Sequence, residues 1–492
     1  MVTSQKVQRN PDIAQDVELE PLHTVIADIF EQRVVSGHAL GSCFALFGTD
    51  GVLFEGGFGH RRPGSPAPDG NTVFRIASCT KSFTSAVLLL LRDRGLLHLD
   101  SAITAFVPEF VSTAPETDPV TPTVRMLMTM SAGLPTDDPW GDRQESMTKA
   151  GLAHLLRAGV PFVSIPGTRF EYSNLGYALL GQVIEIVTGR PYIDVVRSEL
   201  IEPLGLSSTG YTVSEFSIAD VASGYRKKGE EWLELPFSGP GVFSPMGGLF
   251  STPHDLATWA RWLSSALHPE TVIPGPLSAA SRREMQQISR LVASAPTGHQ
   301  SVPMEHGYGY GYGLFVDHEP MWGNTTHHSG GYPGFSTHMR WNEHIGIGIV
   351  GFENATYSNV KKPVSDALDR VVEYVGSTAK RVTPWPEMQQ LRRKVESLLG
   401  GWNDHIANEV FADNVALDKP YAERVVDIAE AIDAVEGVYP NSSLQQPEFS
   451  GDSPAHLLWY LPGRSGRLRC EVRLAPTNPP LIQTFEVSAE VD

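Results

Sequence analysis

The chain has 492 residues, 41% of them hydrophobic and 19% charged, with a formal net charge of −18 at pH 7. This length is ample for a large core and too great for one average domain. The acidic balance argues against nucleic acid or an anionic membrane as a partner. The longest leucine-rich run, residues 86–91, is far too short to span a bilayer. Three cysteines (Cys43, Cys79 and Cys470) are too few for a disulfide framework.

The first hundred residues predict a tail, a helix and a hairpin. We expect residues 1–18 to be disordered. They contain no apolar run that would serve as a signal peptide, so a cytoplasmic location is expected. A helix is predicted from Leu19 to about Val35. Residues 43–46 and 52–57 alternate like strands, and Thr49-Asp50-Gly51 between them is typical of a hairpin turn.

Ser78 and Lys81 begin the most informative segment. The apolar positions 83, 86, 87, 90 and 91 follow helical spacing, which predicts a buried helix from about Ser78 to Gly95. Residues three apart share a helix face, so the Lys81 amine is expected one turn above the Ser78 hydroxyl. A serine hydroxyl is a weak nucleophile until a base lies beside it. This pair would supply that base near the positive end of the helix.

The Ser-x-x-Lys spacing is weak on its own, because it recurs at Ser146, Ser358 and Ser377. Two further motifs support a catalytic interpretation of Ser78 and Lys81. Tyr172-Ser173-Asn174 precedes an apolar helix predicted over residues 175–187, where a loop can present side chains to a cleft.

The third motif, His327-His328-Ser329-Gly330-Gly331, is predicted to lie at the end of a strand and in the turn after it. Strand-like runs follow at residues 336–341 and 345–352. Neighbouring residues on a strand point to opposite faces, so His327 and His328 are poorly placed to bind one metal ion together. No metal or other cofactor is expected.

Together, Ser78/Lys81, Tyr172/Asn174 and His328/Gly330 resemble the three motifs of the penicillin-recognising serine hydrolases. This family includes class C β-lactamases, D-Ala-D-Ala carboxypeptidases, D-aminopeptidases and related family VIII carboxylesterases. The similarity covers roughly residues 20–380 and includes the supporting stretches 125–134, 166–191 and 247–259.

The resemblance implies a role for each motif residue. Ser78 would attack an acyl carbon and carry the acyl group. Lys81 and Tyr172 would share the proton transfers, with the identity of the base left open. Asn174 would hydrogen-bond Lys81 and the substrate, and the backbone N–H groups of Ser78 and Gly331 would form the oxyanion hole.

The remaining predicted site residues concern substrate binding. Gly330 and Gly331 suit a place where substrate approaches the backbone closely. Many β-lactamases have lysine where this chain has His328, and histidine is mostly neutral at pH 7, which argues against an efficient β-lactamase. Trp140 and Tyr308 are predicted to line the pocket.

The resemblance implies an α/β (α+β), β-lactamase-like fold for residues 19–383. An antiparallel sheet flanked by helices would be built from the two ends of this segment, around a helical insert at about 101–300. A strand at 308–316 and a closing helix at 360–375 belong to the second end.

Thr383-Pro384-Trp385-Pro386 is predicted to be a boundary. Residues 384–492 would form a small α+β domain, because a segment of this length is within the usual size range of a domain. Its predicted helices cover 387–399 and 421–435, and its predicted strands cover 456–461, 467–474 and 481–487.

The leading hypothesis is a serine hydrolase that acts on small carboxylic esters or amides through an acyl-serine intermediate. Three alternatives stay open: a D-stereospecific peptidase, amidase or β-lactam hydrolase; an acyltransferase; and a non-catalytic binding protein on the same fold. The expected partner is a small-molecule ester, amide or peptide substrate. The sequence leaves self-assembly into a homo-oligomer open.

Overall fold

The computed structural model describes residues 19–111, 120–292, 307–319, 323–376, 384–438, 449–451 and 453–491. They form two compact units, one within residues 19–376 and the other within residues 384–491. The predicted disordered tail, residues 1–18, lies outside the described residues.

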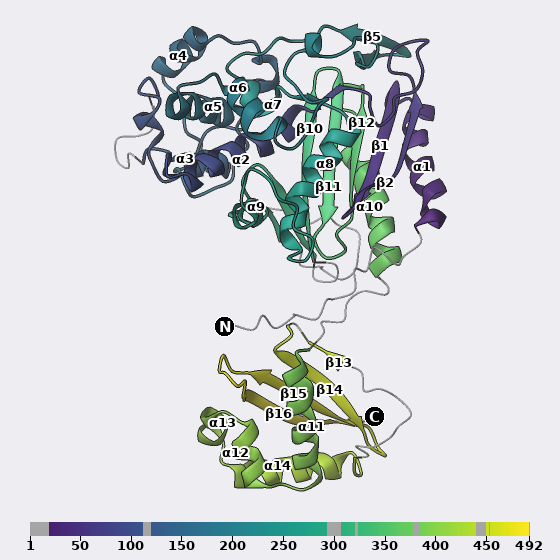
Figure 1. The fold of residues 1–492 in the computed structure, drawn as a ribbon, viewed down its shortest axis with the longest axis vertical. Helices are drawn as coiled ribbons and strands as arrows, with labels where there is room; N and C mark the ends of the chain where they lie inside the picture. The colour runs from purple at the N-terminus through teal and green to yellow at the C-terminus, as the bar shows by residue number, and fades with distance from the viewer. Residues whose placement is uncertain are drawn as a thin grey trace. The chain divides into compact units, whose positions relative to one another are not determined.

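The larger unit is built on an eight-stranded sheet whose strands come from both ends of the segment (Figure 1). All neighbouring strands in it are antiparallel, in the order β2-β1-β12-β11-β10-β9-β8-β7. The predicted fold class is confirmed. The strands are β1 (Gly41–Gly48), β2 (Gly51–Gly59), β7 (Arg290–Leu291), β8 (Gly307–Tyr310), β9 (Phe315–Glu319), β10 (Gly323–Tyr332), β11 (Phe335–Asn342) and β12 (Gly348–Glu353).

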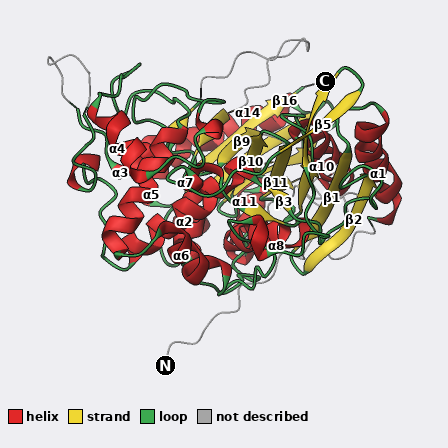
Figure 2. Ribbon diagram, turned by 90° about the horizontal axis from the view of Figure 1, so that it is seen from above, coloured by secondary structure: helices red, strands yellow, loops and turns green. Residues whose placement is uncertain are grey.

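Helices cover both faces of this sheet. Helix α8 (Pro253–Ser264) packs on one face, and α1 (Glu20–Val35) and α10 (Lys361–Gly376) pack on the other (Figure 2). Every residue of β1 is buried for this reason. Phe30 of α1 stacks on Phe44 of β1 at a ring-centroid distance of 4.4 Å.

A group of helices lies beside the sheet (Figure 1). Short strands β3 (Phe74–Arg75) and β6 (Phe250–Ser251) pair with each other, and β4 (Gly224–Lys228) and β5 (Glu231–Leu235) form a separate hairpin. The helices are α2 (Thr80–Asp93), α3 (Val124–Met128), α4 (Lys149–Arg157), α5 (Asn174–Thr188), α6 (Tyr192–Val196), α7 (Ser244–Gly247) and α9 (Ala279–Met285).

Three predicted strand boundaries are wrong. The single strand predicted over 308–316 is instead two strands, β8 and β9, because Gly313 turns the chain with φ +72°. The strand predicted from residue 345 begins at Gly348, after a turn at Gly346 with φ +66°. The motif around His328, predicted at a strand end, lies wholly within β10, and the turn follows Tyr332.

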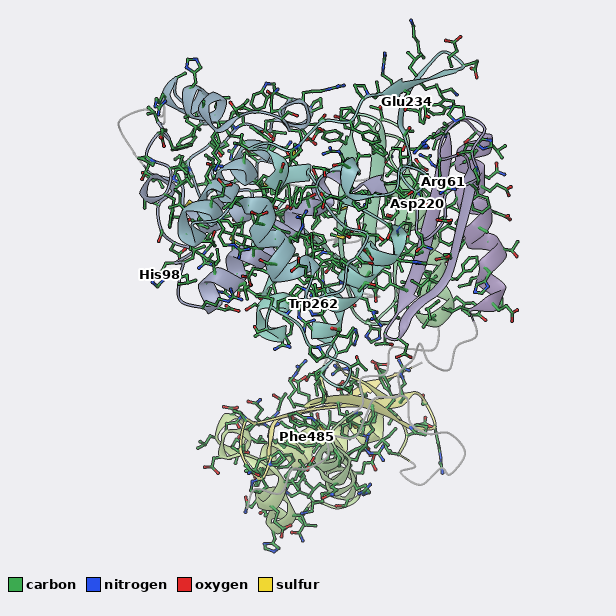
Figure 3. All side chains as sticks on the ribbon, turned by 45° about the horizontal axis from the view of Figure 1, so that its top comes forward. Arg61, His98, Asp220, Glu234, Trp262 and Phe485 are labelled. Carbon is green, nitrogen blue, oxygen red and sulfur yellow. The ribbon has the colours of Figure 1, made fainter. Side chains whose placement is uncertain are left out.

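The smaller unit is a four-stranded antiparallel sheet with helices. Its order is β13-β14-β15-β16, and its core includes Phe485, which is labelled in Figure 3. The Phe485 ring stacks on Phe411 at a ring-centroid distance of 5.0 Å. The sequence missed its two shorter helices. The elements are α11 (Pro386–Gly400), α12 (Asp404–Val410), α13 (Asp413–Asp418), α14 (Tyr421–Ala434), β13 (Phe449–Ser450), β14 (His456–Pro462), β15 (Arg467–Leu474) and β16 (Ile482–Glu490).

None of the helices within the described ranges has both the length and the apolar character needed to cross a membrane.

Candidate active site

Ser78 lies in a strained turn between β3 and α2. Residues Ala77–Cys79 form a 3₁₀ turn, in which Ala77 has φ +45°, a left-handed conformation that residues with a side chain rarely adopt. The Thr80 hydroxyl donates to the Ala77 carbonyl (2.7 Å) and fixes the turn. Backbone strain held in this way concentrates at functional sites. Cys79 is fully buried, and burial raises the pKa of its thiol well above the usual value.

Strand β10 passes very close to this turn, and Gly330 makes that approach feasible. A Cβ atom at Gly330 would lie only 2.1 Å from the Ile76 carbonyl oxygen. The Cys79 thiol also donates to the His328 carbonyl at 3.5 Å. The third motif is therefore packed directly against the first.

The Lys81 side chain is completely buried and all three of its donors are satisfied. Nζ donates to Ser78 Oγ (2.9 Å), Asn174 Oδ1 (2.7 Å) and the Met246 carbonyl (2.8 Å). All three acceptors are neutral. Burial lowers the pKa of Lys81 to about 8, although three nearby carboxylates act in the opposite direction: Asp138, Asp142 and Asp137.

Asn174 is fixed at the first turn of α5. Asp137 caps that helix by accepting from the backbone N–H groups of Asn174 (2.6 Å) and Leu175 (2.8 Å). The Asn174 amide nitrogen donates to Asp138 Oδ1 at 2.7 Å, so its carbonyl oxygen faces Lys81. The helix ends at Thr188, and Gly189 follows it as the C-cap with φ +67°.

Tyr172 lines the same cavity as Ser78, and its interaction with the Ser78 hydroxyl acts to lower the pKa of Tyr172, against the larger effect of burial. Its ring centroid is 4.9 Å from Lys81 Nζ. Burial, followed by the charge of Asp138, raises the pKa of Tyr172 well above its usual value. Of the two candidate bases, Lys81 therefore has the lower pKa.

His328 is buried and neutral. Its Nδ1 donates to the Ser329 carbonyl (2.6 Å), because a carbonyl can only accept. Its Nε2 then accepts from the Tyr310 hydroxyl (3.3 Å). Burial and the nearby Lys81 charge hold the pKa of His328 well below its usual value.

A cavity of about 470 Å³ opens beside Ser78. Lys81 and Asn174 are buried behind its wall. Trp140 does not line this cavity: it is 43% exposed and packs edge-on against Phe243. The lining residues are Ser78, Asp138, Phe170, Tyr172, Val292, Tyr308, Phe315, His328, Ser329, Gly330, Gly331, Ser336, Thr337, Tyr357, Asn359, Val360 and Lys361. No group of three His, Cys, Asp or Glu side chains in the described part of the chain is arranged to hold a metal ion.

The sequence analysis missed the segment after β12. Tyr357 and Asn359 line the cavity, and the Tyr357 hydroxyl donates to Asp142 Oδ2 at 2.7 Å. Burial, together with the charge of Asp138, raises the pKa of Asp142 to about 7. The strand order would have indicated this segment. Because β10 and β12 are both antiparallel to β11, they run in the same direction, and the residues that follow β12 lie at the same end of the sheet as those that follow β10.

The sequence profile of the Beta-lactamase family matches residues 26–373, well over half of the chain. The chain belongs to the Beta-lactamase family of serine hydrolases. The resemblance inferred from the three motifs is confirmed.

Curated relatives are similar at about a quarter identity. Protein flp of Staphylococcus aureus (strain COL) is 25% identical over 357 residues, which cover 71% of this chain and 66% of that protein. The match thus spans just under two thirds of the length of that relative. The D-alanyl-D-alanine-carboxypeptidase/endopeptidase AmpH of Escherichia coli (strain K12) is 25% identical over 384 residues, covering 75% of this chain and 94% of that protein.

Solved structures share the fold. The octameric penicillin-binding protein homologue from Pyrococcus abyssi has a TM-score of 0.61 at 20% identity, covering 96% of this chain and all of that chain. The D-amino acid amidase from Ochrobactrum anthropi SV3, complexed with L-phenylalanine amide, has a TM-score of 0.55 at 27% identity, covering 73% of this chain and 99% of that chain.

We predict that Gly330→Ala displaces the Ser78 turn and lowers kcat about 100-fold, because a misplacement of about 1 Å can cost that much. The matched control is Gly239→Ala, since a Cβ there meets no atom within 4 Å. Ester hydrolysis and far-UV circular dichroism of both variants test this. Wild-type kcat in a folded Gly330→Ala protein would contradict it.

Proposed function

We propose that the chain hydrolyses small carboxylic esters or amides through an acyl-Ser78 intermediate. The observation that carries the proposal is the 2.9 Å contact between Lys81 Nζ and Ser78 Oγ, with a pKa of Lys81 lowered to about 8. An amine of this kind acts as a general base at neutral to mildly alkaline pH.

In the proposed acylation, neutral Lys81 accepts the Ser78 proton while Oγ attacks the substrate carbonyl carbon. The oxygen of the tetrahedral intermediate would lie at the N–H groups of Ser78 and Gly331. The proton then passes to the leaving alcohol or amine, directly from Lys81 or through the Tyr172 hydroxyl. Deacylation repeats these steps with water as the nucleophile, and releases a carboxylic acid and free Ser78.

A second candidate is hydrolysis of the amide of an amino acid that bears a free amine. Asp138 favours it, because this carboxylate lines the cavity at its exposed rim while one of its oxygens holds Asn174. A carboxylate placed there would attract a substrate ammonium group. Similarity to the D-amino acid amidase of Ochrobactrum anthropi supports the same reading.

We predict that Ser78→Ala lowers hydrolysis of p-nitrophenyl acetate and butyrate by about 10³-fold or more, because no other group would form the acyl intermediate. The control is Ser146→Ala in the second Ser-x-x-Lys sequence, where the hydroxyl donates to the Gly239 carbonyl instead of contacting the lysine. Release of p-nitrophenol and trapping of the acyl-enzyme by intact mass measure the effect. Equal rates in wild type and Ser78→Ala would refute the proposed role.

The pH profile should follow Lys81. Because only neutral Lys81 can accept a proton, kcat/KM is expected to rise with pH and to level off above about pH 8. Asn174→Asp would place a carboxylate next to Nζ, raise the pKa of Lys81 and move this rise to higher pH. Profiles from pH 5.5 to about 10, corrected with Ser78→Ala, test this. An inflection that Asn174→Asp leaves in place would exclude Lys81 as the titrating base.

For the second candidate, we predict that Asp138→Asn lowers kcat/KM for D-alaninamide about tenfold, the range of one charge-assisted hydrogen bond. Asparagine retains the acceptor for Asn174 but loses the charge. The internal control is N-acetyl-D-alaninamide, which has no ammonium group. Its hydrolysis should not fall, because loss of the Asp138 charge acts on it only through Lys81, whose pKa Asp138 raises. Ammonia release measures both rates, and an equal loss on both amides would rule out amine recognition by Asp138.

A further inference from the structure

Lys361, the first residue of α10, places a cation on the wall of the cavity beside Ser78. It is the sole lysine or arginine among the described residues that line this cavity. Its Nζ lies 5.7 Å from the centroid of the Tyr308 ring, another lining residue. The side chain is partly buried, and burial lowers the pKa of its ammonium group.

Within the described ranges, no carboxylate forms an ion pair or hydrogen bond with the Lys361 ammonium. Asp317 attracts it, but that carboxylate is already paired with Arg340 (2.9 Å) and His327 (3.3 Å). A partly buried charge without a partner is costly, and an anion supplied by a ligand would offset that cost. The next residue, Lys362, instead faces solvent and pairs with Asp366 at 2.7 Å.

The last residues of β10 line the cavity together with Ser78 and Lys361. In the described residues, β9 pairs with β10 only from Gly323 to His327. Ser329 and Gly331, beyond that point, line the same cavity as Ser78 and Lys361. His328 contributes no charge here, because burial keeps it neutral. The positive charge of the cavity wall therefore comes from α10.

We propose, on the basis of the acyl-Ser78 function above, that Lys361 binds a carboxylate of the substrate, so that the enzyme prefers esters or amides carrying an anionic group to their neutral counterparts. The carboxylate belongs to either the leaving group or the acyl group, and two pairs of esters separate these sources. The first pair is 4-acetoxybenzoate and its methyl ester. The second is mono-p-nitrophenyl succinate and its methyl ester.

The first experiment measures binding without turnover. Titration calorimetry with Ser78→Ala protein should show tighter binding of the anionic member of one pair. Adding Lys361→Gln should abolish that preference, a change of about 10- to 100-fold, which is the range of a hydrogen bond to a charged group. Lys361→Arg should retain most of it, and Lys362→Gln all of it. Equal affinities within both pairs, or no binding of any of the four esters, would overturn the proposal.

The second experiment measures kcat/KM for the same esters in protein with Ser78 intact. Lys361→Gln should lower the anionic-to-neutral ratio by the same factor, whereas Lys362→Gln should leave the rates on both kinds of ester unchanged. An equal loss on neutral and anionic esters would overturn the proposal, because it would assign Lys361 to the structure of the cavity. If the Ser78→Ala protein shows the binding preference while wild type cleaves none of the esters, the acyl-Ser78 function fails and carboxylate binding by Lys361 stands.

Discussion

The burial of the Lys81 ammonium is the constraint on which the site depends. A lysine inside a protein must satisfy three donors, and here the acceptors come from three segments: the Ser78 turn, the start of α5 and the short helix α7. Each segment is held by a hydrogen bond of its own, and in the Ser78 turn this is the bond from the Thr80 hydroxyl to the Ala77 carbonyl. Asp137 caps α5, and Ser244 at the start of α7 donates to the buried carboxylate of Glu145 (2.8 Å). The meeting of these three segments at Lys81 therefore depends on hydrogen bonds between groups that take no part in the proposed reaction.

The second constraint is that, in the part of the chain that the structure describes, no carboxylate touches Lys81. Asp137, Asp138 and Asp142 attract its charge from a distance, while burial opposes that charge and prevails. Asn174 separates Nζ from Asp138 by accepting from one and donating to the other. A direct ion pair would stabilise the ammonium and raise its pKa. An amide in this place keeps Lys81 fixed and still able to lose its proton.

The sequence predicted those parts of the fold that local patterns determine. The helix after Ser78 followed from apolar spacing, and the sheet built from both ends followed from strand-like runs on either side of a helical middle. Two of the errors in strand boundaries lie at glycine turns: Gly313 and Gly346 interrupt runs that the alternation of apolar residues predicts to be continuous strands. The motifs named a lysine and a tyrosine beside Ser78. Their relative acidities depend on burial and on distant carboxylates, which no local pattern contains.

The charge of the cavity shows why the sequence motifs say more about the groups around Ser78 than about the substrate. The three motifs contain the groups around Ser78. Ser78, Tyr172 and His328, one from each motif, all line the same cavity. Lys361 belongs to no motif. It reaches the wall because β12 ends at the same sheet edge as β10, so that the segment entering α10 follows the cavity. With His328 neutral and Lys361 charged, selectivity for the charge of a substrate would be set by α10. The sequence of that helix can change without altering any group that contacts Ser78.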